Sequence, residues 1–147
     1  MPSPLLITGA SGQIGRWLLH ALLQKAPAQP LALALRDPAR QLRDLRDWLS
    51  ARGADEAQLG QLQAHPYRLE DKDAAQALVC ALRPHTLVHL AARFEWGLTA
   101  TEARRAQLQA TEALWQVQTD PLGHAGRFVA LGGYMTQHRP HLARLGI

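Results

Sequence analysis

The sequence predicts an α/β fold with a doubly wound parallel sheet of five strands, covered by helices on both faces. Short apolar runs alternate with stretches of helical periodicity, as in successive βαβ units, whose right-handed crossovers produce parallel strands. The length of 147 residues is that of one domain, spanning residues 1–147. The common strand order 3-2-1-4-5 would place a crevice at the carboxyl ends of strands 1 and 4.

The first half of the chain contains two strand–helix units. Residues 5–7 form an apolar run that ends in glycines, and the next helix should bury one face, comprising Ile14, Trp17, Leu18, Ala21 and Leu22. Two prolines stop that helix before a second apolar run at residues 31–35. An amphipathic helix at about residues 40–52 follows, with Leu42, Leu45, Trp48 and Leu49 on its apolar face. Residues 53–64 are compatible with a loop or a short helix.

The second half repeats the alternation. We expect a weak strand at residues 64–69, a helix at 73–82, a buried strand at 86–91 and a helix at about 99–118. A turn at residues 121–126 then precedes a last strand at 128–131. Within the fourth strand, His89 is expected to be a packed, hydrogen-bonded core histidine. Phe94 and Trp96, just past it, could either pack at the rim of the core or contact a substrate.

Composition and charge exclude several classes of protein. No apolar run approaches the roughly 20 residues of a membrane span, and the N-terminus lacks the features of a signal peptide, so we expect a cytoplasmic protein with no membrane partner. The net charge of +4 comes from scattered basic residues, which argues against a nucleic-acid partner. A lone cysteine, Cys80, excludes a disulfide framework and a CxxC zinc site. His138 and His141 are expected to be a surface pair, so no metal site is predicted.

The turn after the first strand reads Gly9-Ala10-Ser11-Gly12-Gln13-Ile14-Gly15. It leaves a buried strand and opens a helix, which is the context a dinucleotide-binding turn requires. Glycines let the backbone approach a diphosphate, and the helix N-terminus supplies N–H donors and partial positive charge. We favour this interpretation over a simple packing turn, because three glycines cost backbone entropy with no evident packing return.

Two segments together resemble the extended short-chain dehydrogenase/reductase superfamily, of the NAD-dependent epimerase/dehydratase type. They are residues 8–15 and the run Leu87-Val88-His89-Leu90-Ala91-Ala92. The likeness extends over nearly the whole chain but covers only the front half of such an enzyme. It implies a Rossmann-like sheet that binds a nicotinamide dinucleotide.

The resemblance also implies roles for individual residues. Gly9, Gly12 and Gly15 would line the diphosphate, Ser11, Gln13 and Ile14 would add turn contacts, Leu69 would border the adenine, and Ala91 and Ala92 would lie beside the nicotinamide ribose. The family usually has an acidic residue before that leucine, where this chain has Arg68. Gln107 stands where the family favours an asparagine, and it reads equally well as a helix-face residue.

The end of the second strand indicates which nucleotide is bound. Arg36 lies where an NAD enzyme of this plan carries an acidic residue that holds the ribose 2′-hydroxyl. A guanidinium there favours the 2′-phosphate of NADP, with Arg40 assisting and Arg16 adding positive charge nearby. NAD stays an alternative because Asp37 is adjacent, and Arg36 could equally be a solvated strand-end residue.

The sequence provides no catalytic residue of the expected kind. The family uses a tyrosine with a lysine four residues later, but Tyr67 and Tyr134 are followed at that spacing by Asp71 and His138. The usual hydroxyl at the end of the fifth strand is replaced by Gly132-Gly133, with only Thr136 nearby. We expect a chain truncated before its catalytic pair, which binds nucleotide without turnover.

These observations leave two functional hypotheses. The first is the dinucleotide-binding portion of an NAD(P)-dependent oxidoreductase, epimerase or dehydratase, whose full-length form acts on a small-molecule carbonyl or sugar-nucleotide-like substrate. The alternative is a catalytically inactive NAD(P)-binding or sensor module. A homodimer that pairs through the edge of the fifth strand is a third, structural reading.

Overall fold

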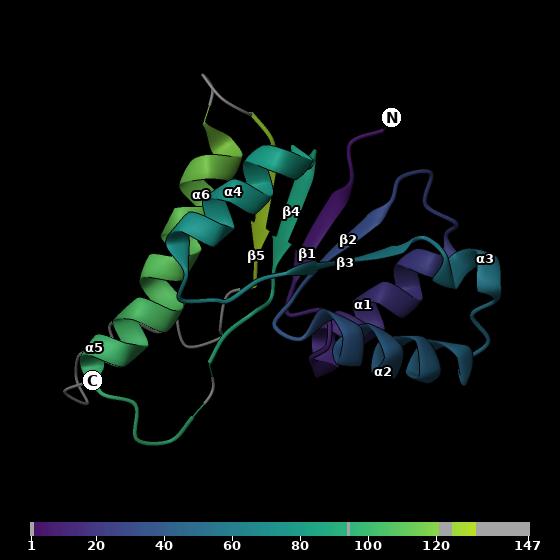
Figure 1. Cartoon of the computed structure of the whole chain (residues 1–147), viewed down its shortest axis with the longest axis horizontal. Helices are drawn as coiled ribbons and strands as arrows, with labels where there is room; N and C mark the ends of the chain where they lie inside the picture. Colours follow the sequence, from purple (N-terminus) through teal and green to yellow (C-terminus); the bar gives the residue numbers. More distant parts are fainter. Residues whose placement is uncertain (1, 94, 121–124, 132–147) are drawn as a thin grey trace, which may run out of the picture.

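The computed structural model describes residues 2–93, 95–120 and 125–131, which form a parallel sheet between two helical layers (Figure 1). The strand order is β3-β2-β1-β4-β5, which confirms the doubly wound α/β prediction. The strands are β1 (Leu5–Thr8), β2 (Leu31–Leu35), β3 (Leu62–Pro66), β4 (Thr86–His89) and β5 (Arg127–Ala130). All four neighbouring pairs are parallel. The chain reverses its direction of winding between β1 and β4, so the loops after these strands diverge and leave a crevice.

The helices divide between the two faces of the sheet (Figure 1). One layer contains α1 (Gln13–Gln24), α2 (Pro38–Ser50) and the short α3 (Glu56–Leu59). The other contains α4 (Lys72–Leu82) and a long helical stretch made of α5 (Ala100–Ala103), the π-helical segment η1 (Arg104–Gln109) and α6 (Ala110–Thr119).

Alternating side chains of the central strands supply a core to each layer. Leu5 and Ile7 of β1 pack with the apolar residues of α1 and α2, while Leu6 between them packs with those of α4 and α6. Every residue of β1 and β2 is buried, as expected for strands covered on both faces. This arrangement fixes the carboxyl ends of the strands, from which the site is built.

Two strands end earlier than predicted. The strand expected at residues 64–69 runs from Leu62 to Pro66, and after the Tyr67 N–H bonds to the Leu35 carbonyl (2.8 Å) the chain turns away, which leaves Leu69 in a loop. The strand expected at residues 86–91 ends at His89. The Leu90 N–H still bonds to the Thr8 carbonyl (3.1 Å), whereas the Ala91 N–H bonds to the Thr8 hydroxyl (3.2 Å) instead of to a strand carbonyl.

The buried face of α1 also differs from the prediction. Ile14 and Trp17 are 55% and 51% exposed, whereas Gly15, Leu19 and Leu23 are buried. Leu18 and Leu22, of the predicted face, are partly buried against the same core, so the buried side of the helix is shifted from the predicted face rather than opposite to it. This orientation is possible because Gly15 has no side chain to hold the helix away from the preceding turn.

Local capping explains two further features. Residues 53–64, which the sequence left open, contain α3, whose N-terminus is closed by a capping box between Asp55 and Gln58. The helix expected at about residues 99–118 does begin after Thr99, which forms a capping box with Glu102. It is not a uniform α-helix, however, because η1 interrupts it. Single-turn π-helical segments are frequent at functional sites.

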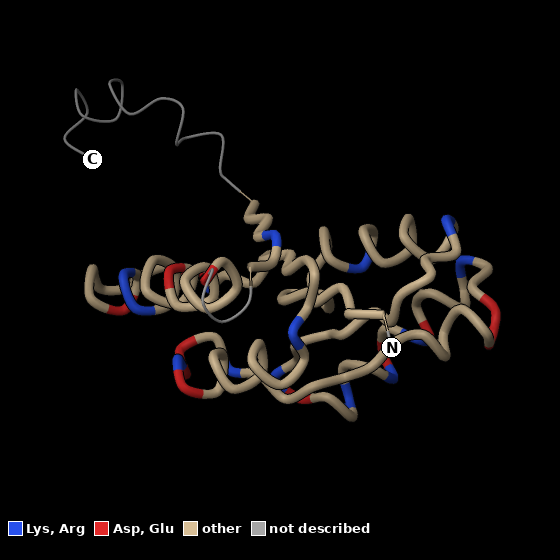
Figure 2. The backbone as a smooth tube through the Cα atoms, turned by 90° about the horizontal axis from the view of Figure 1, so that it is seen from above, with Lys and Arg blue, Asp and Glu red and all other residues tan. Residues whose placement is uncertain are grey.

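Charges are interspersed over the described backbone. Figure 2 shows Lys and Arg residues mixed with Asp and Glu residues on several helices and loops rather than gathered on one face. No helix in the described part of the chain is long and apolar enough to cross a membrane. The predicted turn at 121–126 lies mostly outside the described residues, as do Gly132, Gly133, Tyr134, Thr136, His138 and His141.

Candidate functional site

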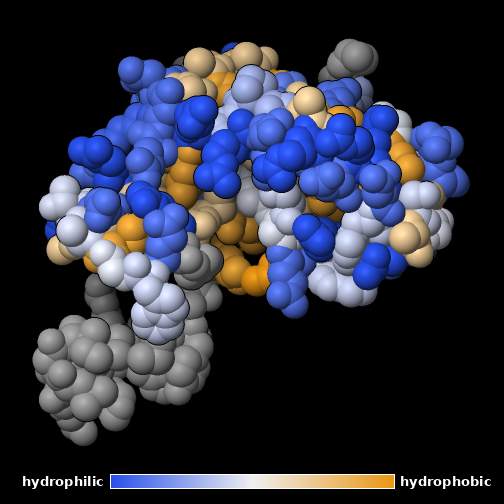
Figure 3. Space-filling model, turned by 60° about the horizontal axis from the view of Figure 1, so that its bottom comes forward, coloured by the Kyte–Doolittle hydropathy of each residue, from blue (hydrophilic) through white to orange (hydrophobic). Residues whose placement is uncertain are grey.

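A cleft of about 2080 Å³ opens at the carboxyl ends of the strands, between the diverging loops. Figure 3 shows it as a hollow with a hydrophobic floor between hydrophilic rims. This volume exceeds the roughly 300–1,000 Å³ of a typical small-ligand pocket, so the cleft can accept an elongated molecule. It is lined by all ten residues that the sequence singled out, namely Gly9, Ser11, Gly12, Gln13, Ile14, Gly15, Arg36, Leu69, Ala91 and Ala92.

Two of the three glycines in the turn are required by packing. Gly9 has a φ of +72°, and a Cβ atom there would lie 2.6 Å from the Ala91 backbone nitrogen. A Cβ atom on Gly15 would lie 2.6 Å from the Ala10 Cα. The inference that the glycines bring no packing return is therefore wrong for these positions, because they let the segment after β4 and the start of α1 approach the turn closely.

Gly12 is different, because packing constrains it less than Gly9 and Gly15. It is exposed, its φ is −72°, and an added Cβ atom would meet only the Gly9 carbonyl oxygen, at 3.3 Å. Gly12 is also the N-cap of α1, where no side chain accepts from the first-turn amides and no acidic residue is present. By contrast, aspartate side chains cap α2 and α4. The open N-terminus of α1 therefore presents N–H donors to the cleft.

Side chains from two helices brace the middle of the turn. Arg16 Nη2 donates to the Ser11 carbonyl oxygen (2.8 Å), and Gln41 Nε2 donates to the Ser11 hydroxyl (2.7 Å). The Arg16 guanidinium also lies 5.5 Å from the centroid of the Trp48 ring. Arg16 was predicted only to add positive charge, and the structure gives it this second, structural role.

The ends of β2 and β3 place two arginines at one end of the cleft. Arg36 follows β2 and Arg68 follows β3; both are exposed and both line the cleft. Within the described ranges neither forms a hydrogen bond or salt bridge. Arg40, which was expected to assist Arg36, instead pairs with Asp37 (3.2 Å) on the outer surface. The positive charge at this end therefore comes from Arg36 and Arg68.

Tyr67 directly follows β3 and is 6% exposed. It packs with Ala34 and Leu69 in the core of the α4 layer, and burial raises the pKa of its hydroxyl to about 12. That hydroxyl has no hydrogen-bond partner in the described structure. An unpaired buried hydroxyl costs stability.

The prediction that His89 is a packed, hydrogen-bonded core histidine is confirmed. Its ring is 5% exposed, Nδ1 lies 2.7 Å from the Thr8 hydroxyl, and Nε2 lies 3.1 Å from the Thr111 hydroxyl. Burial lowers the pKa of His89 to about 4, so the ring is neutral at physiological pH. Thr8 and His89 together hold the loop that carries Ala91 and Ala92.

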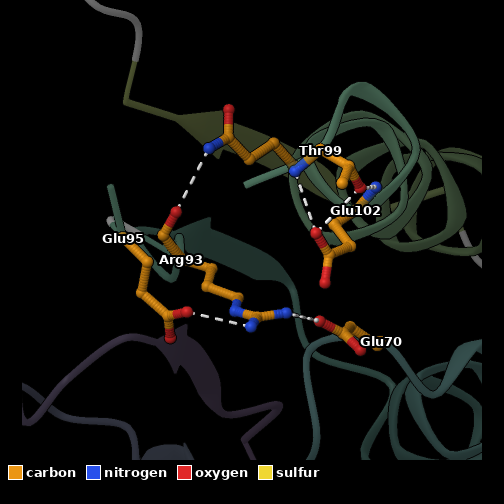
Figure 4. A network of polar contacts seen from close by, with 6 residues as sticks. Glu70, Arg93, Glu95, Thr99 and Glu102 are labelled. Atoms are coloured by element: carbon orange, nitrogen blue, oxygen red, sulfur yellow. Dashed lines mark hydrogen bonds and ion pairs between the residues drawn. The ribbon is translucent and has the colours of Figure 1, made fainter. Parts of the chain in front are cut away.

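A polar network that the sequence did not reveal crosses the cleft (Figure 4). Arg93 bridges Glu70 (3.2 Å), in the loop after β3, and Glu95 (2.9 Å), while Gln107 donates to the Arg93 carbonyl (3.2 Å). The hydrogen bond that Glu95 accepts from the Arg93 side chain is the main cause that lowers the pKa of Glu95. The Arg93–Glu70 pair depends on the approach of two separate loops, so no local sequence pattern predicts it.

The other predicted contacts near β4 have mixed outcomes. Trp96 is fully exposed, so it does not pack in the core, and Phe94 lies outside the described residues. The described residues contain no cluster of three or more side chains that could hold a metal ion. The cleft thus combines an open helix N-terminus, the unpaired guanidinium groups of Arg36 and Arg68 within the described ranges, and a row of backbone and apolar groups, which is suited to an extended anionic ligand with flat rings.

Sequence comparison identifies a family over most of the chain. A family model described as the NAD dependent epimerase/dehydratase family matches residues 5–132. No curated protein sequence gives a match.

Solved structures share the fold at low sequence identity. The terminal R domain from the myxalamid PKS-NRPS pathway is 15% identical with a TM-score of 0.72, covering 90% of this chain and 35% of that one. WbmG from Bordetella bronchiseptica, solved with NAD, is 15% identical with a TM-score of 0.61, covering 88% and 37%. Uronate dehydrogenase from Agrobacterium tumefaciens is 22% identical with a TM-score of 0.57, covering 89% and 41%. The chain therefore spans well under half the length of these structures.

Proposed function

Because the chain belongs to the NAD-dependent epimerase/dehydratase family, we propose that it is the dinucleotide-binding portion of an NAD(P)-dependent oxidoreductase, epimerase or dehydratase. The substrate of the complete protein would be a carbonyl compound or a sugar-nucleotide-like molecule. The dinucleotide would lie across the carboxyl ends of β1 and β4, with its diphosphate at the N-terminus of α1. Its nicotinamide would supply or accept a hydride.

The observation that carries this proposal is the state of Gly12. Packing accounts for Gly9 and Gly15, whose Cβ atoms would lie under 3.0 Å from backbone atoms, but a Cβ atom on Gly12 would meet only the Gly9 carbonyl oxygen, at 3.3 Å. A close approach of the protein backbone to a bound ligand would explain a glycine at that position, since the uncapped amides of α1 face the same space. The ten predicted residues around one cleft support the same assignment.

For the choice of nucleotide, we propose a modest preference for NADP over NAD. Arg36 and Arg68 stand together at the end of the cleft that would hold the adenosine, and a 2′-phosphate there would pair with a guanidinium. WbmG was solved with NAD, so the preference rests on this chain's own arginines.

Binding is tested by titrating NADP and NAD into the full chain and into a Gly12→Val variant. The valine side chain would stand where the diphosphate approaches, and we expect at least a tenfold loss of affinity, or about 1.4 kcal/mol. Gly60→Val is the matched control. Gly60 is also exposed, its φ is −65°, and its added Cβ atom would likewise meet a backbone carbonyl oxygen, that of Glu56, at 3.2 Å, but it lies outside the cleft.

The two variants separate binding from folding. Equal melting temperatures with a loss of affinity only in Gly12→Val support the diphosphate site. Unchanged affinity in Gly12→Val would remove it, and an equal loss in both variants would show that the effect is structural.

A second candidate is a module that binds NAD(P) and catalyses nothing. These 147 residues contain no Tyr-x-x-x-Lys sequence, so both candidates predict that this chain by itself turns over no substrate. Nicotinamide absorbance at 340 nm, followed with a panel of carbonyl and sugar-nucleotide substrates, tests that shared prediction. Turnover would exclude the inactive module.

A further inference from the structure

A continuous set of hydrogen bonds runs from the end of β4 into the helical layer. The Ala91 N–H donates to Thr8 Oγ1 (3.2 Å), Thr8 Oγ1 lies 2.7 Å from His89 Nδ1, and His89 Nε2 lies 3.1 Å from Thr111 Oγ1. The Thr111 hydroxyl donates to the Gln107 carbonyl oxygen (2.6 Å). We call this set, from Ala91 to Gln107, the His89 relay.

The direction of each bond in the relay follows from the number of protons available. Thr111 has one hydroxyl proton, which goes to the Gln107 carbonyl, so the contact with His89 requires a proton on Nε2. In the neutral ring Nδ1 is then an acceptor and takes the Thr8 hydroxyl proton. The lone pairs of Thr8 Oγ1 remain available for the Ala91 N–H. The Nδ1–H tautomer would leave the contact between Nε2 and Thr111 without a proton.

The far end of the relay lies in the π-helical segment η1. Gln107 belongs to η1, and its side chain donates to the Arg93 carbonyl (3.2 Å) while its own carbonyl accepts from Thr111. The loop after β4 is therefore held twice: at the Ala91 N–H through Thr8, and at the Arg93 carbonyl through Gln107. His89 is the group that connects the two attachments.

We infer that His89, as the Nε2–H tautomer, is a positioning residue that couples η1 to the Ala91–Arg93 loop and so sets the nicotinamide end of the cleft. His89 acts through Thr8 and Thr111 and carries no step of the chemistry itself. The inference rests on the proposed dinucleotide function for the identity of the ligand. The tautomer and the bond directions rest on this chain's contacts alone.

The first test is spectroscopic and needs no ligand. A long-range ¹H–¹⁵N correlation spectrum of the full chain at neutral pH reports which ring nitrogen carries the proton, and His89→Gln assigns the signals. We expect a single Nε2–H tautomer for His89. A protonated Nδ1, or the mixed tautomers of a solvated ring, would overturn the relay.

The second test separates the two halves of the cleft. In Thr111→Val, which removes the hydroxyl and keeps the shape, affinity for NADP should fall about three- to tenfold, as for one lost hydrogen bond. Affinity for adenosine 2′,5′-bisphosphate, which lacks the nicotinamide half, should not change. Thr111→Ser keeps the hydroxyl and should restore both the NADP affinity and the tautomer.

Thr119→Val is the matched control on the same helix. The Thr119 hydroxyl donates to the carbonyl four residues earlier (Trp115, 2.8 Å), as Thr111 does, but it does not reach His89. It should leave tautomer and affinities unchanged. An equal loss of both ligands in Thr111→Val, or no loss of either, would overturn the positioning role. A wild-type chain that binds neither ligand would instead overturn the proposed function. The ¹H–¹⁵N spectrum would still test the His89 relay, because it needs no ligand.

Discussion

Removing the Arg36 guanidinium should abolish the preference for NADP. Arg36 follows β2 directly, and Arg68 follows the neighbouring β3, where the Tyr67 N–H bonds to the Leu35 carbonyl (2.8 Å). The two guanidinium groups therefore extend from adjacent strand ends into one end of the cleft. Of the two, Arg36 occupies the position that contacts the adenosine ribose in proteins of this plan.

The size of the effect follows from exposure. A charge-assisted hydrogen bond contributes roughly 1.5–3 kcal/mol, and because Arg36 is exposed, solvent screening places this contact near the lower limit. About 1.5 kcal/mol corresponds to a roughly tenfold weaker binding of NADP in Arg36→Ala. Binding of NAD, which lacks the 2′-phosphate, should change little.

Calorimetric titration of both nucleotides into wild type and variant measures this difference. Arg43→Ala is the matched control, because Arg43 is an exposed residue of α2 that does not line the cleft and its removal changes the net charge equally. In wild type the NADP preference should decrease as ionic strength rises. At low salt, Arg43→Ala should show the same NADP preference as wild type. Equal affinity of wild type for the two nucleotides, or an equal loss of both in Arg36→Ala, would refute the reasoning.

Three further predictions concern stability. Burial lowers the pKa of His89 to about 4, against 6.5 for the free side chain, so as pH falls the unfolded chain binds a proton before the folded chain does. The free energy of unfolding should therefore drop by about 2 kcal/mol from pH 7 to pH 5. Chemical denaturation at the two pH values should show a smaller drop in His89→Gln. Gly9→Ala should lower the melting temperature far more than Gly12→Ala, since it combines a positive φ with a backbone clash at Ala91; similar melting temperatures would contradict the packing account. Tyr67→Phe should leave stability unchanged or raise it by up to about 1 kcal/mol in urea unfolding, because the lost hydroxyl has no partner in the described structure; a clear loss of stability would reveal one.

The sequence was sufficient to predict the structure wherever a local pattern of residues determines it. The apolar runs of β1 and β2 contain little but leucine, isoleucine and alanine, and the structure buries both completely. Glycines and prolines mark the ends of the flanking elements. Because the carboxyl ends of parallel strands share one edge of a sheet, the order of elements alone brought Arg36, Leu69 and Ala91 to the same cleft.

The sequence was insufficient to predict the structure where a side chain distant in the sequence bonds to the backbone. At the end of the predicted fourth strand, the Leu90 N–H still bonds to the Thr8 carbonyl, but the Ala91 N–H bonds to the hydroxyl of Thr8, more than eighty positions earlier. The Arg93 bridge to Glu70 likewise joins two loops whose approach depends on the completed sheet. Periodicity reports only which face of an element is apolar, so it contains no information on such pairs.

The glycine turn illustrates how one motif serves two physical ends. Gly9 and Gly15 would be needed even in a protein that bound nothing, because backbone atoms of Ala91, after β4, and of Ala10, in the turn, lie where their Cβ atoms would be. A matching spacing of glycines is therefore evidence for this strand–turn–helix packing first. Gly12 is exposed, and an added Cβ atom there would meet only the Gly9 carbonyl oxygen, at 3.3 Å, so packing requires this glycine far less than the other two. Substitutions at Gly12 consequently probe binding, whereas those at the other two glycines probe folding, and an affinity lost at Gly9 would say nothing about a diphosphate.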